Sequence, residues 1–146
     1  MNRQEQGDLG EASARCWYEF AGHVVLVPTG RSPYSDFVAD DGERLIKVQV
    51  KSSGQWRHDR WHVAICTRGG NRSWSGVAKY FSATRCDELF VVTTDGRRWR
   101  IPSDEVEART AIVLGGGKYR QFEVDAGPRL GSRPAPFSLV SSSPAG

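Results

Sequence analysis

Paired cysteines are absent from this chain. Its 146 residues include three cysteines, Cys16, Cys66 and Cys86, which are odd in number, widely spaced and without a CxxC pair. This spacing excludes a cysteine metal knuckle and a CxxC redox centre. It indicates a reduced intracellular environment.

Long apolar runs are absent as well. No stretch approaches the roughly 18 residues that a membrane-spanning helix requires. The amino terminus, MNRQEQGDLGE, lacks the hydrophobic core of a signal peptide. We therefore expect a cytoplasmic protein that is not secreted and has no membrane partner.

Two sequence patterns, a histidine pair and a glycine-rich stretch, resemble a zinc site and a phosphate-binding loop, but each lacks an essential part of its motif. His58 and His62 are four residues apart, but this spacing aligns zinc ligands only on a helix, and WHVAICT is typical of a strand. The stretch GGGKYR at 115–120 lacks the Gly-Lys-Ser/Thr frame of a phosphate-binding loop. The sequence therefore argues against a zinc centre and against nucleotide hydrolysis.

Charge of one sign does not dominate, but its distribution is uneven. The chain has 20 Lys and Arg against 17 Asp and Glu, and without Arg129 and Arg133 the balance is 18 to 17. Basic residues gather among aromatic ones between residues 56 and 81, at Arg57, Arg60, Arg68, Arg72 and Lys79. Cationic and aromatic side chains together favour contact with a nucleic-acid backbone, and the alternative is a solvated loop whose tryptophans cap the core.

A single domain accounts for the body of the chain. Its length suits one hydrophobic core. The final stretch, GPRLGSRPAPFSLVSSSPAG, is rich in Pro, Gly and Ser, so it lacks the apolar surface that would offset the entropy of ordering. We predict one domain over residues 1–126 and a flexible tail over residues 127–146.

Apolar spacing predicts one clear helix near the start. Asp8 and Glu11 form a capping pattern, and apolar residues then recur at helical spacing as far as a stop at Gly22. Strands are expected at residues 23–28, 61–67, 89–94, 98–102, 110–114 and 119–124. Ser103 is expected to cap a short helical turn, and SGVAKYFSAT fits either a loop or a helix. This order predicts a mixed α/β or α+β domain.

A hairpin at residues 35–52 supplies the candidate site. SDFVAD and RLIKVQVKS flank Asp41-Gly42, a strong hairpin dipeptide, and Asp95-Gly96 predicts a second such turn. With Asp41 and Gly42 as the two loop residues, Asp36 pairs with Lys47. Alternation then gathers polar side chains on one face, at Asp36, Lys47, Gln49 and Lys51. An ordinary water-facing sheet surface is the alternative interpretation.

An ordered set of motifs surrounds this face. A helix bearing Glu11 comes first, Pro33 and Asp36 follow, and Gln49-Val50-Lys51 ends the strand. With these residues the chain resembles the PD-(D/E)XK nuclease superfamily, and within it the small endonucleases associated with group I introns and Holliday-junction-resolvase-like relatives. The resemblance spans roughly residues 7–106, through GDLGE, SPYSDFVAD, LIKVQVKSS, DELFVV and IPSDEV. Two residues separate Pro33 from Asp36, and Gln49 holds the second acidic position, as in the intron-associated branch.

The resemblance implies a restriction-endonuclease-like core, with a mixed sheet flanked by helices, and a divalent cation. It implies Mg²⁺, with Mn²⁺ as a substitute, held by Asp36, the Gln49 amide oxygen and the Val50 carbonyl, which are hard oxygen donors. Lys51 would orient the attacking water or stabilise the phosphoryl charge, with Glu11 in support. The alternatives are structural: Asp36 paired with Lys47, a solvated Lys51, and Glu11 serving as a cap or a partner of Arg15.

Together these observations predict a metal-dependent endodeoxyribonuclease. We expect it to cut double-stranded DNA as a homing or intron-associated enzyme located at the nucleoid. One site per chain and two strands to cut favour a homodimer or homotetramer. The alternatives are a resolvase of branched DNA, a DNA-binding module without activity, and a sheet protein that binds other proteins.

Overall fold

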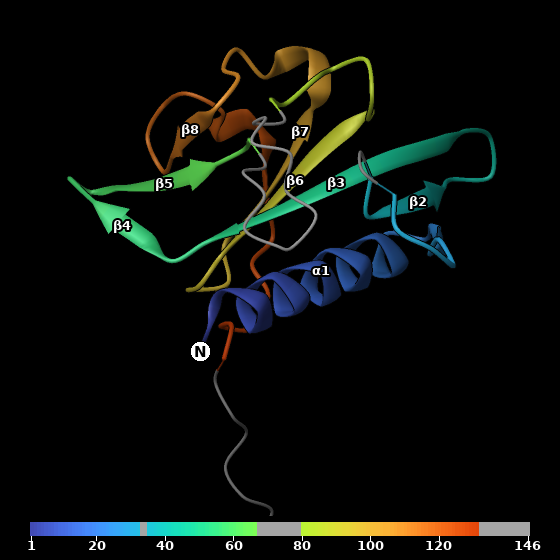
Figure 1. The fold of residues 1–146 in the computed structure, drawn as a ribbon, viewed down its shortest axis with the longest axis horizontal. Coiled ribbons are helices and arrows are strands. Elements are labelled where there is room, and N and C mark those ends of the chain that lie inside the picture. The colour runs from blue at the N-terminus through green and yellow to red at the C-terminus, as the bar shows by residue number, and fades with distance from the viewer. Residues whose placement is uncertain (33–34, 67–79, 132–146) are drawn as a thin grey trace, which may run out of the picture.

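The computed structural model describes residues 1–32, 35–66 and 80–131 (Figure 1). These ranges contain a single α-helix, nine strands and two 3₁₀ turns. In chain order the elements are α1 (Arg3–Phe20), β1 (Val24–Leu26), β2 (Phe37–Asp40), β3 (Leu45–Ser53), β4 (Gln55–Arg57), β5 (Arg60–Ala64), β6 (Glu88–Thr93), β7 (Arg98–Pro102), η1 (Ser103–Glu105), β8 (Ala111–Leu114), η2 (Arg120–Phe122) and β9 (Glu123–Val124).

The strands form two sheets. The larger has the order β1-β2-β3-β6-β7-β9, and the smaller has the order β4-β5-β8. Neighbouring strands are antiparallel except β3 and β6, which pair in parallel with Val50 opposite Phe90. Strand β6 is buried along its whole length, whereas the neighbouring β3 has exposed residues only in its first half. This mixed sheet confirms the predicted mixed α+β fold.

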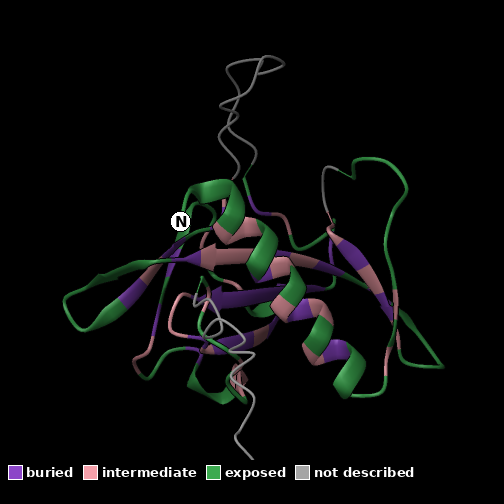
Figure 2. Cartoon of the chain, turned by 90° about the horizontal axis from the view of Figure 1, so that it is seen from below, coloured by how far each residue is buried: buried purple, intermediate pink, exposed green. Residues whose placement is uncertain are grey.

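Helix α1 covers one face of the large sheet (Figure 2). Its buried residues Gly10, Ala14 and Tyr18 face the sheet, and most of its other side chains remain accessible. Ala14 and Tyr18 join an apolar cluster whose other members come from the strands, at Phe37, Ala39, Ile46, Val48, Val50, Phe90 and Val92. The helix begins five residues before the predicted start at Asp8, because Asn2 and Glu5 form the capping box. Gly22 ends it as predicted, with a φ of 93°.

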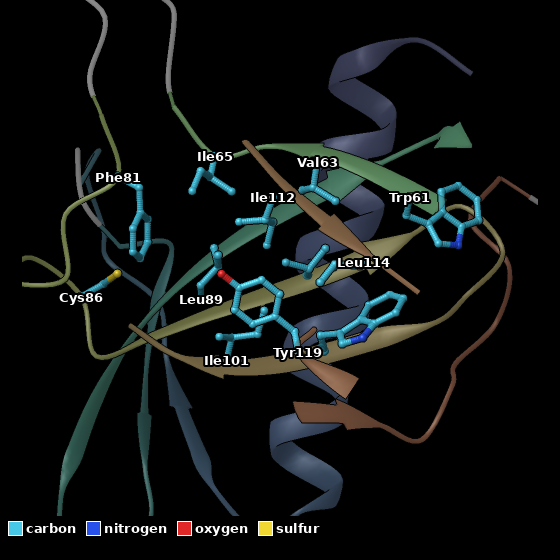
Figure 3. Packing of buried hydrophobic residues seen from close by; sticks show 12 residues of the cluster. Trp61, Val63, Ile65, Phe81, Cys86, Leu89, Ile101, Ile112, Leu114 and Tyr119 are labelled. Carbon is cyan, nitrogen blue, oxygen red and sulfur yellow. The ribbon is translucent and has the colours of Figure 1, made fainter. Parts of the chain in front are cut away.

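The small sheet covers the opposite face (Figure 3). Trp61, Val63, Ile112 and Leu114 point from β5 and β8 toward Leu89, Val91, Trp99 and Ile101 of the large sheet. The large sheet therefore lies between a helix and a second sheet, and it is apolar on both faces. Among the described residues, no helix has the length and apolarity needed to cross a bilayer.

The first hairpin forms with a longer turn than predicted. Asp40 pairs with Leu45 and Val38 with Lys47, so four residues rather than two form the loop, and the predicted pair of Asp36 with Lys47 is wrong. The Asp41 carboxylate explains the longer turn, since its oxygen accepts hydrogen bonds from Glu43 N and Arg44 N. The register shift is an even number of residues, so the predicted faces are retained.

Several other elements differ from the sequence prediction. Strand β4 was not expected, Arg120–Phe122 is a 3₁₀ turn rather than a strand, and Ser103 lies inside its turn, where Pro102 is the cap. The first half of SGVAKYFSAT lies outside the described residues, and the second half, residues 80–84, contains no helix or strand. In the segment expected to be a tail, Gly127 N donates to Gly96 O and Leu130 N to Thr94 O. Residues 132–146 are outside the described part.

Candidate active site

The candidate site lies where β2 begins beside the middle of β3. Asp36 immediately precedes β2, and its backbone N–H donates to Val48 O at 2.8 Å. Its carboxylate Oδ2 accepts a hydrogen bond from Val50 N at 2.7 Å. Within the described ranges, no strand pairs with the last residues of β3 on this side. The Asp36 carboxylate is therefore fixed at an open edge of the sheet.

The Val50 carbonyl faces the same edge. In a strand, the N–H and C=O of one residue point to the same side. Because Val50 N–H points toward Asp36, the carbonyl oxygen of Val50 is directed to that side too. A carboxylate and a backbone carbonyl thus lie together at this edge.

Glu11 reaches the same place from α1. The helix approaches β3 closely because Gly10 has no side chain: a Cβ there would lie 3.0 Å from Ser52 Cβ. Burial, then the charge of Asp36 and a hydrogen bond with it, raise the pKa of Glu11 from 4.5 to about 7, and Arg15 opposes the rise. The two carboxylates are therefore direct neighbours. Of the alternatives, capping is wrong because Glu11 lies in mid-helix, whereas the contact with Arg15, at 3.5 Å, exists.

Lys51 approaches from the other face of the sheet. It is half-buried, and burial lowers the pKa of its ammonium, while Asp36 and Cys66 act in the opposite direction. The charge of Asp36 therefore acts on the Lys51 ammonium, although Lys51 lies on the face of the large sheet that the small sheet covers. The alternative of a fully solvated lysine is wrong.

Gln49 lies two residues before Lys51 on the same face of β3 and is half-buried. Its backbone is opposite Leu89 of β6. Asp36 thus interacts electrostatically with both Glu11 and Lys51, and Gln49 and Val50 directly precede Lys51 along the chain. Lys47 was the predicted cross-strand partner of Asp36. Its backbone N–H instead donates to Asp87 Oδ2 at 2.8 Å.

The donors at this edge fit a hard divalent cation. Two carboxylates held together at partial burial repel each other, and this repulsion adds to burial in raising the pKa of Glu11. A cation between them would relieve it, and oxygen donors suit Mg²⁺. In the part of the chain that the structure describes, no group of three or more His, Cys, Asp or Glu side chains could hold a metal ion. The candidate set here mixes carboxylate, amide and carbonyl oxygens.

The predicted basic residues are only partly described. Arg57 and Arg60 are exposed on β4 and β5, whereas Arg68, Arg72 and Lys79, like Pro33, lie outside the described residues. Two further arginines, Arg98 and Arg100, lie on β7. Both are structural: Arg98 binds Asp125 and Ser13, and Arg100 forms an ion pair with Glu88.

A buried polar cluster was missed from sequence. Glu88 accepts hydrogen bonds from Arg100 and from Tyr18 Oη, the latter at 3.1 Å, and it joins α1 to β6 and β7. A glutamate at the start of an apolar strand is the signal that could have indicated it, with Arg100 two residues from its cross-strand partner Pro102.

The chain is similar to known nucleases. The family model described as PD-(D/E)XK endonuclease matches residues 1–114. The solved structure of a bacterial homing endonuclease, I-Ssp6803I, has a TM-score of 0.68 to this chain, with 24% sequence identity and coverage of 83% of both chains. At that identity the likeness shows a shared fold. No curated protein matches the sequence.

Proposed function

The chain belongs to the PD-(D/E)XK endonuclease family, and from this premise we propose that it hydrolyses phosphodiester bonds in double-stranded DNA with Mg²⁺, as an enzyme of the homing or intron-associated type. The observation that carries the proposal is the meeting of Asp36, Glu11 and Lys51 at the open edge of β3. The fold shared with a homing endonuclease supports the type of enzyme.

Asp36 is the proposed principal metal ligand. Its Oδ2 accepts a hydrogen bond from Val50 N–H, which holds the carboxylate at the edge of β3. The Val50 carbonyl and the Gln49 amide oxygen complete the proposed set, with Glu11 in support. Members of this family generally use divalent metal ions, and a bound Mg²⁺ supplies positive charge to the phosphoryl oxygens. Because Gln49 is uncharged, the ion is held less tightly than by a third carboxylate.

Lys51 is the proposed cation at the reacting phosphate. Its ammonium is partly withdrawn from water, where a charge acts more strongly on a neighbouring anion than in solvent. It stabilises the negative charge that develops on the phosphoryl oxygens, or orients the attacking water. Glu11 lies beside Asp36 and holds a proton that a cation would displace.

Cutting a duplex needs two sites. Each chain carries a single candidate site, so a symmetric homodimer or homotetramer is the proposed assembly.

Plasmid nicking tests the proposal. Asp36→Asn keeps an oxygen for Val50 N–H but removes the ligand charge, and Lys51→Ala removes the ammonium. We expect each variant to lower the cleavage rate by roughly a hundredfold or more in Mg²⁺. The rate is measured by the conversion of supercoiled plasmid to nicked and linear forms.

Matched control variants separate the loss of a catalytic group from the effect of a changed net charge. Lys47→Ala removes an exposed lysine from the same strand, and Asp104→Asn removes an exposed acid from η1. Both should cut at the wild-type rate. Salt-sensitive DNA binding without any cutting would instead support an inactive binding module, and preferential cutting of four-way junctions over linear duplexes would support the resolvase alternative.

A further inference from the structure

A two-stranded hairpin extends from the strand that carries Lys51. Only Ser52, Ser53 and Gly54 separate Lys51 from β4, and β4 and β5 then form an antiparallel pair at the margin of the fold (Figure 1). The register places Gln55 opposite His62, Trp56 opposite Trp61 and Arg57 opposite Arg60. Strand β5 also pairs with β8 from Trp61 to Ala64, so the hairpin is two-stranded only at Arg57, Arg60 and the turn between them. This end of the hairpin is a ribbon that extends from the strand of the candidate active site.

The two faces of this ribbon differ in character. Cross-strand partners share a face, so Trp56 and Trp61 lie on one side, with ring centroids 5.1 Å apart, and Trp61 enters the core between the sheets. The opposite side, which we call the ribbon face, consists of Gln55, Arg57, Arg60 and His62. The first three are exposed and His62 is half-buried. Every member of the ribbon face carries hydrogen-bonding groups.

The side chains of the ribbon face retain donors and acceptors. His62 Nε2 lies 3.2 Å from the Arg57 carbonyl, which can only accept, so Nε2 carries the hydrogen and Nδ1 of the neutral ring is left as an acceptor. Arg57 Nη2 is 3.4 Å from Gln55 Oε1, and Arg60 Nη1 donates to Asp59 O at 2.8 Å. Each guanidinium has further N–H groups, and that of Arg60 lies against the backbone of Gly116.

The tip of the ribbon is a tight turn without glycine. His58 and Asp59 have φ values of 51° and 59°. Such a turn normally contains Asn-Gly or a similar pair, because both central residues need positive φ. Here two polar side chains occupy these positions and remain exposed. The ribbon thus keeps polar groups at its end at the cost of backbone strain.

The base of the ribbon is fixed to the large sheet. Ser53 Oγ donates to His62 O and accepts from Gln55 N. A Cβ at Gly54 would lie 3.1 Å from Thr94 Cγ2 and 3.2 Å from Gln6 Oε1, so the chain passes through a narrow space there. Gln55 Cα lies no more than about 14 Å from Lys51 Cα, four residues away. The position of the ribbon relative to the reacting phosphate is therefore nearly constant.

We propose that the ribbon face enters the DNA major groove and reads bases within a few base pairs of the cut. This inference rests on the proposed nuclease function. A two-stranded ribbon fits the major groove, where arginine pairs with guanine and glutamine with adenine. The reach from Lys51 corresponds to about four base-pair steps, at roughly 3.4 Å each. Arg57 and Arg60 add charge that complements the phosphates.

Selection of bound duplexes tests this inference without requiring cleavage. Full-length protein in EDTA is incubated with a random duplex pool, and the bound DNA is sequenced for the wild type and for Gln55→Ala, Arg57→Ala and Arg60→Ala. Each variant should relax the preference at one or two adjacent base pairs by roughly tenfold. Preferences elsewhere should be retained. Arg44→Ala, in the β2–β3 turn at the other end of β3, is the matched arginine control and should leave every preference unchanged.

The possible results separate the two proposals. A uniform loss of affinity with unchanged preferences, and a salt slope lower by about one per arginine, would mean phosphate contact and would overturn base reading. Wild-type binding without any preference would overturn it as well. Relaxed preferences in the variants support base reading even if no DNA is cut in Mg²⁺, a result that would count against the nuclease function alone. Urea unfolding of each variant checks that the fold is retained.

Discussion

The chemistry of individual residues depends on which neighbours the fold supplies. Glu11 is an ordinary helix glutamate in sequence, but partial burial and the adjacent Asp36 carboxylate raise its pKa to about 7. Asp36 is held by a backbone N–H, and Lys51 is partly withdrawn from water. Two acids and a cation therefore share one site, and the charge of Asp36 raises the pKa of Glu11 and opposes the lowering of the pKa of Lys51 by burial.

The raised pKa of Glu11 predicts a pH-dependent stability. Between pH 4.5 and about 7 the folded state binds more protons at Glu11 than the unfolded state, so its contribution to stability is complete below pH 4.5 and is lost as pH rises through 7. In EDTA, the unfolding free energy of the wild type minus that of Glu11→Gln should fall from pH 5 to pH 7 and then level off. Urea titrations at unit pH steps measure it.

The control for this effect is Glu19→Gln, which removes an exposed glutamate from the same helix. Its difference from the wild type should not follow the profile of Glu11→Gln. A pH-independent difference for Glu11→Gln would contradict the assigned neighbours of Glu11.

At the scale of elements, the approach of α1 to β3 brings the site together. Gly10 permits the contact with Ser52, and Gln6 Nε2 donates to Ser52 Oγ at 3.2 Å. Glu11, which follows Gly10 in the helix, is thereby brought beside Asp36. A helix held farther from the sheet would separate the two carboxylates, although every local pattern in the sequence would remain the same.

This contact predicts opposite effects for two glycines of α1. Gly7→Ala meets nothing within 4 Å and should stabilise the protein by about 0.5–1 kcal/mol through helix propensity. Gly10→Ala should reduce stability instead, because overpacking typically costs about 1–3 kcal/mol and exceeds that gain. Unfolding in urea gives both values, and Ser52→Gly in the Gly10→Ala background should recover part of the loss. Equal gains for the two alanines would refute the close contact.

At the scale of the whole molecule, the C-terminal segment crosses the β6–β7 turn and joins distant parts of the chain. Gly127 N donates to Gly96 O, and Arg98 bonds both to Asp125 and to Ser13 of α1. Leu130 packs against the cluster between α1 and the large sheet. The segment therefore joins the β6–β7 turn to helix α1.

Gly96 is the residue on which this crossing depends. Its φ is 94°, and a Cβ would lie 2.3 Å from Gly127 O, whereas Gly42 has a φ of 93° with nothing within 4 Å. Gly42→Ala should cost about 1–2 kcal/mol from backbone strain alone. Gly96→Ala should cost at least about 1 kcal/mol more, since the C-terminal segment must also move. Urea unfolding of the two variants compares them, and equal losses would contradict the contact.

Local patterns predicted much of the fold and several site residues. Period-two alternation assigned Gln49 and Lys51 to one face and Val48 and Val50 to the core, and this assignment held although the turn was two residues longer than predicted. The turn was misjudged because an aspartate side chain, rather than the Asp-Gly pair alone, organised it. Strand β4 was missed because three exposed residues give no hydrophobic period.

The sequence by itself determined the residue types, the strand faces and the family, because alternation and motif order are local properties of the chain. Only the tertiary structure decided that Asp36 binds Val50 N–H and that Glu11 reaches Asp36 from the helix that covers the sheet. It also decided that the β4–β5 ribbon extends from the strand that carries Lys51. These placements depend on helix packing, on the end of β2 and on strand pairing. Such contacts join residues far apart in the chain, so no local pattern specifies them.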